Sequence, residues 1–176
     1  KLRDKYMISN NTFVFLYLGR INEDKGIVEL IKAFDYIKKN KNILLILVGS
    51  IEDNKLAHLF KKRNKILYFN FTKKPEDWFS LADTLCLPSH REGFGTVVIE
   101  AASCGIPTLC SKIYGLQDTI IDRKTGFFHK VSSIDDIKSK MLYIIKNKKL
   151  VKKCGSLAKI KVKRDFEQNL ITKKFL

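Results

Sequence analysis

Two uninterrupted apolar segments stand out along the chain, Phe13–Leu18 and Ile43–Val48, and each ends at a glycine. Apolar runs of this length without polar alternation predict strands that are buried on both faces, as in a parallel sheet. Shorter strands are predicted over residues 66–69, 84–87, 106–110 and 126–129. Helices are predicted over residues 28–37, 56–60, 75–81, 96–104, 134–146 and from 149 onward.

Strands that alternate with helices at this spacing predict a doubly wound α/β fold. We expect a Rossmann-like three-layer sandwich with a mostly parallel sheet, and residues 1–176 as a single domain. Ligands of such sheets bind beyond the carboxyl ends of the strands. The loops that follow residues 18, 48, 69, 87 and 110 are therefore the predicted location of the functional site.

The chain of 176 residues is strongly basic, with 34 Lys or Arg, 18 Asp or Glu and a net charge of +16. Residues 138–176 hold 13 of the basic and 2 of the acidic residues, a net +11. This excess is compatible with nucleic acid, with an anionic membrane or with a solvated lysine-rich surface. No apolar segment is long enough to span a bilayer. The N-terminus has no signal-peptide pattern. The chain also starts without Met, so we expect a fragment of a longer protein.

The four cysteines show no paired spacing, and no histidine lies at a metal-binding offset from them. A zinc site is therefore not expected. In a reducing compartment these cysteines would act as small apolar residues.

The first predicted strand ends in a loop that carries two cations, Arg20 and Lys25, between Gly19 and Gly26. The loop lacks the glycine spacing of a P-loop or of a dinucleotide fingerprint. An arginine fork and a lysine beside a helix N-terminus can nevertheless bind a diphosphate. The alternative is a pair of surface cations.

The fourth predicted strand is followed by Pro88-Ser89-His90-Arg91-Glu92-Gly93-Phe94-Gly95-Thr96, and Glu100 lies in the next helix. Glycines before a helix allow backbone amides to approach a ligand. Carboxylates beside a phosphate site are unfavourable for nucleic acid but suit a sugar attached to a diphosphate. Glu100 has apolar neighbours, which predicts a polar residue in a mostly buried helix that would bind a ribose diol. The alternative for Glu100 is an ordinary surface carboxylate.

These motifs together resemble the C-terminal, donor-binding half of glycosyltransferase family 4 (group 1), whose retaining enzymes have the GT-B fold. The resemblance covers residues 12–170 and includes the E-x7-E pair formed by Glu92 and Glu100. Further matching segments are Ala82-Asp83, Tyr114-Gly115-Leu116-Gln117-Asp118, Thr125-Gly126-Phe127 and Gly105-Ile106-Pro107.

The resemblance implies a role for each matching residue. Arg20 and Lys25 would bind the donor diphosphate and stabilise the leaving nucleotide, and Glu92 would contact the donor sugar, so these three are the expected catalytic residues. Glu100 would bind the ribose. The remaining expected contacts to the nucleotide sugar are Gly19, Asn70, Phe71, Gly93, Phe94, Gly95 and Thr96. No metal or other cofactor is implied.

Some features depart from the family pattern. Asn70 stands where glycine is common, the loop 49–51 lacks a second glycine, and Gly115 lacks a glycine before it. The first two leave the base open, with UDP or GDP sugars expected as donor. The family's acceptor domain, which supplies a histidine to the catalytic region, does not match any part of this chain. His90 is not expected to replace that histidine, and His58 and His129 are expected to be structural or exposed.

The resemblance implies an enzyme that transfers a hexose or an N-acetylhexosamine, with retention, to a glycan or lipid-linked acceptor in bacterial surface polysaccharide synthesis, such as capsule or lipopolysaccharide. This chain alone would bind donor and be inactive without its acceptor domain. We expect a cytoplasmic location, with peripheral contact between the basic residues 138–176 and the anionic inner face of the membrane. The alternatives are a non-catalytic nucleotide or nucleotide-sugar binding module and another retaining GT-B activity. The chain has no recognisable nucleic-acid module.

Overall fold

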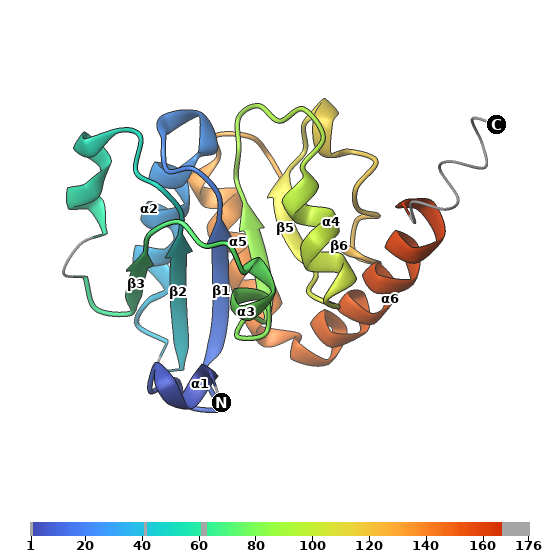
Figure 1. Ribbon diagram of the computed structural model, residues 1–176, viewed down its shortest axis with the longest axis horizontal. Helices are drawn as coiled ribbons and strands as arrows, with labels where there is room; N and C mark the ends of the chain where they lie inside the picture. The colour runs from blue at the N-terminus through green and yellow to red at the C-terminus, as the bar shows by residue number, and fades with distance from the viewer. Residues whose placement is uncertain (1, 41, 61–62, 167–176) are drawn as a thin grey trace.

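A computed structural model describes residues 2–40, 42–60 and 63–166 of the chain. Its centre is a six-stranded sheet in the order β3-β2-β1-β4-β5-β6, with every neighbouring pair parallel. The strands are β1 (Phe13–Leu18), β2 (Ile43–Val48), β3 (Ile66–Phe69), β4 (Thr84–Leu87), β5 (Thr108–Ser111) and β6 (Gly126–His129). Figure 1 shows β1, β2 and β3 pointing the same way, so their carboxyl ends share one edge of the molecule.

Helices cover both faces of the sheet (Figure 1). One face is covered by α2 (Ile27–Ile37) and α5 (Ile134–Lys146), and the other by α3 (Pro75–Phe79) and α4 (Thr96–Ser103). The long α6 (Lys148–Phe166) packs against α4, and a short α1 (Leu2–Lys5) lies at the start of the chain. The expected Rossmann-like three-layer sandwich is thereby confirmed.

The central strand β1 shows how the sequence builds these layers. Its alternate residues Phe13, Phe15 and Tyr17 are buried against the α2 and α5 side, whereas Val14 and Leu16 are buried on the α3 and α4 side. A strand covered on both faces requires apolar residues at every position. This requirement explains the uninterrupted run from which the strand was predicted.

Three predicted elements differ from the structure in type or by two residues or more at one end. The helix predicted over 56–60 is a 3₁₀ helix, η2 (Asn54–Leu59), whose first turn is capped by the Asp53 carboxylate. The helix from Pro75 ends at Phe79 instead of Leu81. The fifth strand starts at Thr108 instead of Ile106, because the Ile106 N–H donates to the carbonyl of Ala101 and the next residue is a proline without an N–H.

Candidate functional site

The loops after β1 and β2 are joined side by side beyond the sheet. The Ile21 N–H donates to the Ser50 carbonyl at 2.8 Å, and the Glu52 N–H donates to the Ile21 carbonyl at 3.0 Å. These bonds continue the pairing of the two strands past their ends. They bring Glu52, which the sequence did not single out, next to the cation-bearing loop after β1.

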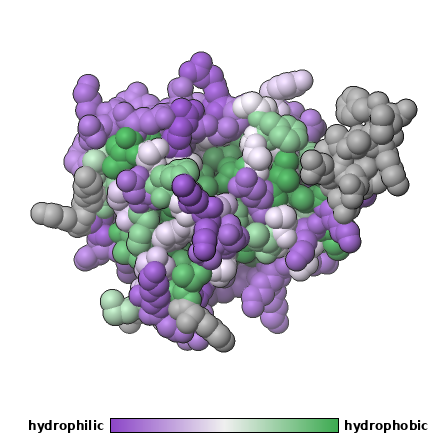
Figure 2. All heavy atoms as spheres, in the orientation of Figure 1, coloured by the Kyte–Doolittle hydropathy of each residue, from purple (hydrophilic) through white to green (hydrophobic). Residues whose placement is uncertain are grey.

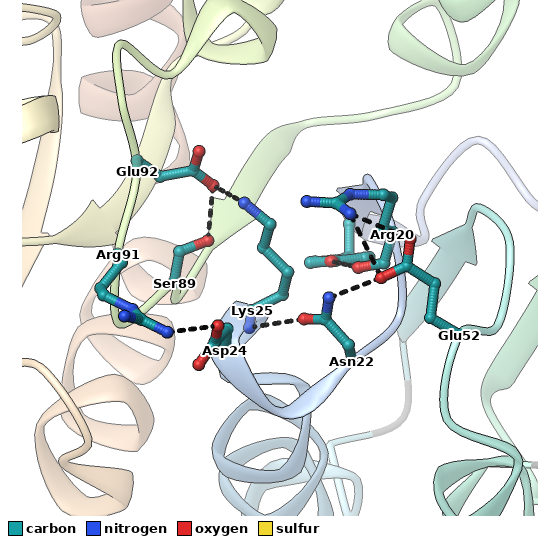
Figure 3. A network of polar contacts seen from close by, with 9 residues as sticks. Arg20, Asn22, Asp24, Lys25, Glu52, Ser89, Arg91 and Glu92 are labelled. Carbon is teal, nitrogen blue, oxygen red and sulfur yellow. Dashed lines mark hydrogen bonds and ion pairs between the residues drawn. The ribbon is translucent and has the colours of Figure 1, made fainter.

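Arg20 is fixed through both its backbone and its side chain. The buried Tyr17 hydroxyl donates to the Arg20 carbonyl. Burial raises the pKa of that phenol, so the hydroxyl stays protonated and remains a donor. Arg20 Nη1 lies 3.0 Å and 3.3 Å from the two carboxylate oxygens of Glu52 (Figure 3). The guanidinium thus lies at the strand ends, as predicted, with a partner that the sequence did not reveal.

Lys25 forms the best-protected ion pair of the described site. It lies in a 3₁₀ turn, η1 (Glu23–Lys25), and its Nζ lies 2.7 Å from Glu92 Oε1; the two side chains are 16% and 14% exposed. The Ser89 hydroxyl donates to the same carboxylate oxygen at 2.8 Å. Figure 3 shows the Lys25 side chain extended from its turn toward the loop that carries Glu92. Two residues predicted separately, 67 positions apart, are therefore in direct contact.

Gly26 permits this contact because the two loops touch through their backbones. Its φ of +63° lies in the left-handed region, and a Cβ atom there would lie 2.1 Å from the Pro88 carbonyl oxygen. Only glycine can therefore bring the turn that carries Lys25 against the segment that leads to Ser89 and Glu92.

A second set of contacts fastens the same two loops. The Arg91 guanidinium lies 2.7 Å from an Asp24 carboxylate oxygen, and its hydrogen bond lowers the pKa of that carboxyl group. The His90 N–H donates to the Asp24 carbonyl at 2.8 Å, and its imidazole Nε2 lies 3.1 Å from Glu29 Oε1. His90 therefore points toward Glu29 of α2, and its lack of a direct role stays a prediction.

The other two histidines also fit their predicted positions. His129 is buried at the end of β6, with its Nδ1 beside the Lys130 carbonyl oxygen, and His58 is exposed.

Three of the cysteines are buried and Cys104 is exposed. In the described ranges, no three His, Cys, Asp or Glu side chains are arranged to hold a metal ion.

Glu100 is more exposed than predicted. It was expected to be a polar residue in a mostly buried helix, but its side chain is exposed, because α4 is only eight residues long and buries Val98, Ala101 and Ala102 on its sheet-facing side. Desolvation nevertheless raises the pKa of the Glu100 carboxyl group. Among the described residues its carboxylate has no hydrogen-bonding partner, which leaves it available to a ligand.

The start of α4 presents the rest of the predicted glycine motif. Gly95, in a left-handed conformation, precedes the helix, while Gly93, Phe94 and Thr96 are exposed. The Phe94 ring packs edge-on against the Phe166 ring of α6, with centroids 5.8 Å apart. Three of the four residues 93–96 are thus exposed to solvent.

A hollow of about 150 Å³ opens beyond the ends of β1, β2 and β3. It is lined by Leu18, Gly19, Arg20, Val48, Gly49, Ser50, Phe71 and Thr72. Phe71 thus lies at the strand ends, and its contact with a nucleotide stays a prediction. Asn70 does not line the hollow, and its side-chain oxygen accepts a hydrogen bond from the Phe71 N–H at 2.8 Å. Figure 2 shows mainly hydrophilic side chains along the edge of the molecule where these strands end.

A Rossmann-like sheet with cations and carboxylates gathered at its strand ends places this protein among the α/β proteins that bind ligands at the carboxyl edge of the sheet. The sequence model of the family described as "Glycosyl transferases group 1" matches residues 1–161. The chain therefore belongs to the glycosyl transferases group 1 family, and the predicted family is confirmed.

Two curated relatives are similar to this chain over most of its length. The capsular polysaccharide biosynthesis glycosyltransferase CapM of Staphylococcus aureus is 32% identical over 178 residues, covering 97% of this chain and 47% of CapM. A lipopolysaccharide 1,2-N-acetylglucosaminetransferase of Salmonella typhimurium is 29% identical over 141 residues, covering 72% of this chain and 37% of the relative. The chain spans about half the length of CapM.

Solved structures share the fold. Anabaena HepE in complex with UDP-glucose superposes with a TM-score of 0.88 at 21% identity, covering 98% of this chain and 50% of HepE. The C-terminal domain of the group 1 glycosyl transferase LpcC of Francisella tularensis has a TM-score of 0.81 at 20% identity, covering 95% of this chain and 92% of that domain. The expectation of one half of a GT-B fold is confirmed by these likenesses.

Proposed function

We propose that this chain is the donor-binding half of a retaining glycosyltransferase and that it binds a nucleotide diphosphate sugar at the carboxyl edge of its sheet. The observation that carries the proposal is the Lys25–Glu92 pair, with Ser89 on the same carboxylate and Arg20 on the neighbouring loop. Cations for a diphosphate and a carboxylate for a sugar thereby meet at one place.

Arg20 and Lys25 are the proposed diphosphate ligands. As the bond between sugar and phosphate breaks, negative charge accumulates on the departing nucleotide, and two fixed cations stabilise that charge. Both side chains lie on one short loop, so a single diphosphate can reach both. In this proposal the cations supply the neutralisation, and no metal cofactor is invoked.

Glu92 is the proposed sugar ligand. Its Oε1 is occupied by Lys25 and Ser89, whereas its Oε2 has no partner among the residues that the structure describes. A carboxylate with one oxygen held and the other free can accept a hydrogen bond from a sugar hydroxyl through the free oxygen. The backbone amides of Gly93, Phe94, Gly95 and Thr96, at the start of α4, are proposed to bind sugar or phosphate oxygens.

The nucleoside would occupy the hollow that Gly19 and Phe71 line, with Asn70 next to Phe71 in the chain. The open carboxylate of Glu100 is the proposed ribose ligand. The proposal includes UDP-type and GDP-type donors, and the solved complex of HepE with UDP-glucose supports the uridine form.

The complete reaction requires more than this chain. We propose that an N-terminal acceptor domain of the same protein closes the site and that the 176 residues alone are inactive. The names of the capsule and lipopolysaccharide relatives support a glycan or lipid-linked acceptor in surface polysaccharide synthesis. The second candidate, a non-catalytic nucleotide-sugar binding module, would use the same residues without transfer.

Calorimetric titration of the chain with UDP, GDP and ADP sugars tests the donor-binding proposal. One of the three is expected to bind, and its 2′-deoxyribose analogue is expected to bind severalfold more weakly because Glu100 loses a hydroxyl partner. A folded chain that binds none of the three would refute the proposal. Equal binding of the deoxy analogue would refute only the assignment of the 2′-hydroxyl to Glu100.

Peripheral contact with the inner face of the cell membrane is proposed for α6. Lys152, Lys153, Lys159, Lys163 and Arg164 are exposed on it, together with the apolar Leu157 and Ile160. Such a face suits an anionic bilayer surface. Among the described residues, no helix is long and apolar enough to span a membrane.

Co-sedimentation with liposomes tests this membrane contact. A well-placed cation contributes about 1 kcal/mol toward an anionic surface, so binding to phosphatidylglycerol vesicles is expected to exceed binding to phosphatidylcholine vesicles by at least tenfold. Raising the salt concentration should reduce the difference. Equal partition into both vesicle types would instead support a solvated lysine-rich surface.

A further inference from the structure

Glu52 contacts the loop that carries both cations of the site. Its carboxylate oxygens lie 3.0 Å and 3.3 Å from Arg20 Nη1, and its Oε2 also accepts a hydrogen bond from Asn22 Nδ2 at 2.8 Å. Figure 3 shows this carboxylate between the side chains of Arg20 and Asn22, on a different loop from both. One residue of the β2 loop thus contacts two residues of the β1 loop.

The contact with Asn22 reaches Lys25 through the backbone. A carboxylate only accepts hydrogen bonds, so the Asn22 amide must present Nδ2 to Glu52. Its Oδ1 then faces the Lys25 N–H, from which it accepts a hydrogen bond at 3.2 Å as the cap of the turn η1. Glu52 therefore fixes the orientation of the side chain that caps the turn on which Lys25 stands.

Glu52 pairs with only one nitrogen of the Arg20 guanidinium. Both of its oxygens approach the same nitrogen, Nη1, and within the described part of the chain Arg20 Nε and Nη2 have no partner. Arg20 is 63% exposed, so its open edge can still meet a phosphate. The carboxylate constrains the arginine without covering the face that a diphosphate needs.

We propose that Glu52 is a positioning residue for the donor diphosphate, which orients Arg20 directly and the Lys25 turn through Asn22. This inference rests on the proposed function, since it concerns how the same site holds its donor. It assigns a role to a carboxylate that does not itself contact the ligand. The hydrogen bonds from Asn22 and Arg20 lower the pKa of Glu52, which keeps it ionised at neutral pH.

A charge argument makes the opposite prediction, and this makes the proposal testable. Removing a negative charge beside an anion site should tighten binding if only long-range electrostatics mattered. Glu23 offers the matched control: it lies in the β1 loop with Arg20 and Lys25, is exposed, and its side chain makes no hydrogen bond or ion pair with another described residue. Glu23→Gln and Glu52→Gln each remove one negative charge near Arg20 and Lys25.

The experiment measures UDP and GDP binding by calorimetry for the wild-type chain and both variants, with uridine and guanosine binding followed by NMR. Glu52→Gln is expected to weaken binding of the preferred diphosphate about fivefold and to leave its nucleoside unchanged, because only the phosphate contacts lose their geometry. Glu23→Gln is expected to leave diphosphate binding unchanged or up to about twofold tighter. Thermal unfolding of both variants confirms that the fold is retained.

Each other outcome is decisive. Unchanged or tighter diphosphate binding by Glu52→Gln would refute the positioning role while leaving the proposed function intact. Weakening of the nucleoside to the same extent would show a general loss of loop structure and would also refute it. A wild-type chain that binds neither diphosphate would refute the proposed function, and the positioning role with it.

Discussion

Gly26→Ala is expected to lower the free energy of unfolding by about 3 kcal/mol or more. A left-handed conformation alone costs an L-residue about 1–2 kcal/mol. In addition, the new methyl group would lie 2.1 Å from the Pro88 carbonyl oxygen and 2.8 Å from its carbonyl carbon, so two backbone segments would have to separate. Effects of this size are at the upper end of those seen for single substitutions. Urea unfolding followed by circular dichroism measures it.

The same substitution should also reduce nucleotide binding, because the separation would pull Lys25 away from Ser89 and Glu92. Gly93→Ala is the matched control from the facing loop. A Cβ atom at Gly93 meets nothing within 4 Å and the backbone is not left-handed, so stability is expected to change by less than about 0.5 kcal/mol. Equal stability of the two variants would contradict the contact between the loops.

The sheet was predictable because its strands are covered on both faces. That environment demands apolar residues at consecutive positions, and the runs at β1 and β2 display this demand directly. The short 3₁₀ helix at Asn54–Leu59 was mistaken for an α-helix because Leu56, Leu59 and Phe60 have helical spacing. Spacing of apolar residues does not distinguish the two kinds of helix over a single turn or two.

Arg20, Lys25 and Glu92 of the candidate site were singled out from their positions after strands, but their pairing was not predicted and Glu52 was missed. Lys25 and Glu92 are 67 positions apart, and Arg20 and Glu52 are 32 apart. The partners meet because β4 and β2 both flank β1, and the strand order cannot be read from the sequence alone. Arg20 follows β1 and Glu52 follows β2 in the sequence. These positions after two buried strands were the available indication that the two side chains could meet.

The error at Glu100 has a related cause. Val97, Val98, Ile99, Ala101 and Ala102 surround it in sequence, which suggested burial. In a helix, however, only one side faces the sheet, and residues adjacent in sequence point in different directions. The apolar neighbours therefore describe the helix as a whole, whereas the exposure of Glu100 follows from its angular position on α4.

Lys25→Met is expected to weaken UDP or GDP binding by about 100-fold. Methionine keeps most of the apolar stem, so the change removes chiefly the ammonium group. A hydrogen bond between charged partners contributes about 1.5–3 kcal/mol, and here the loss is compounded because Glu92 keeps its charge without a counterion. With 14% of its side chain exposed, that carboxylate would then repel the incoming diphosphate at short range. Calorimetric titration of the free nucleotides measures the change.

Two further variants separate the local contact from overall charge. Arg91→Met removes one cation from the facing loop, but Arg91 is 81% exposed and pairs with the exposed Asp24, so less than threefold weakening is expected. The double variant Lys25→Met/Glu92→Gln should bind UDP or GDP more tightly than Lys25→Met alone, since the unpaired carboxylate is gone and the free nucleotide carries no sugar for Glu92 to contact. If Lys25→Met and Arg91→Met weakened binding equally, Lys25 would act only through the net charge of the surface, and its assignment as a diphosphate ligand would be wrong.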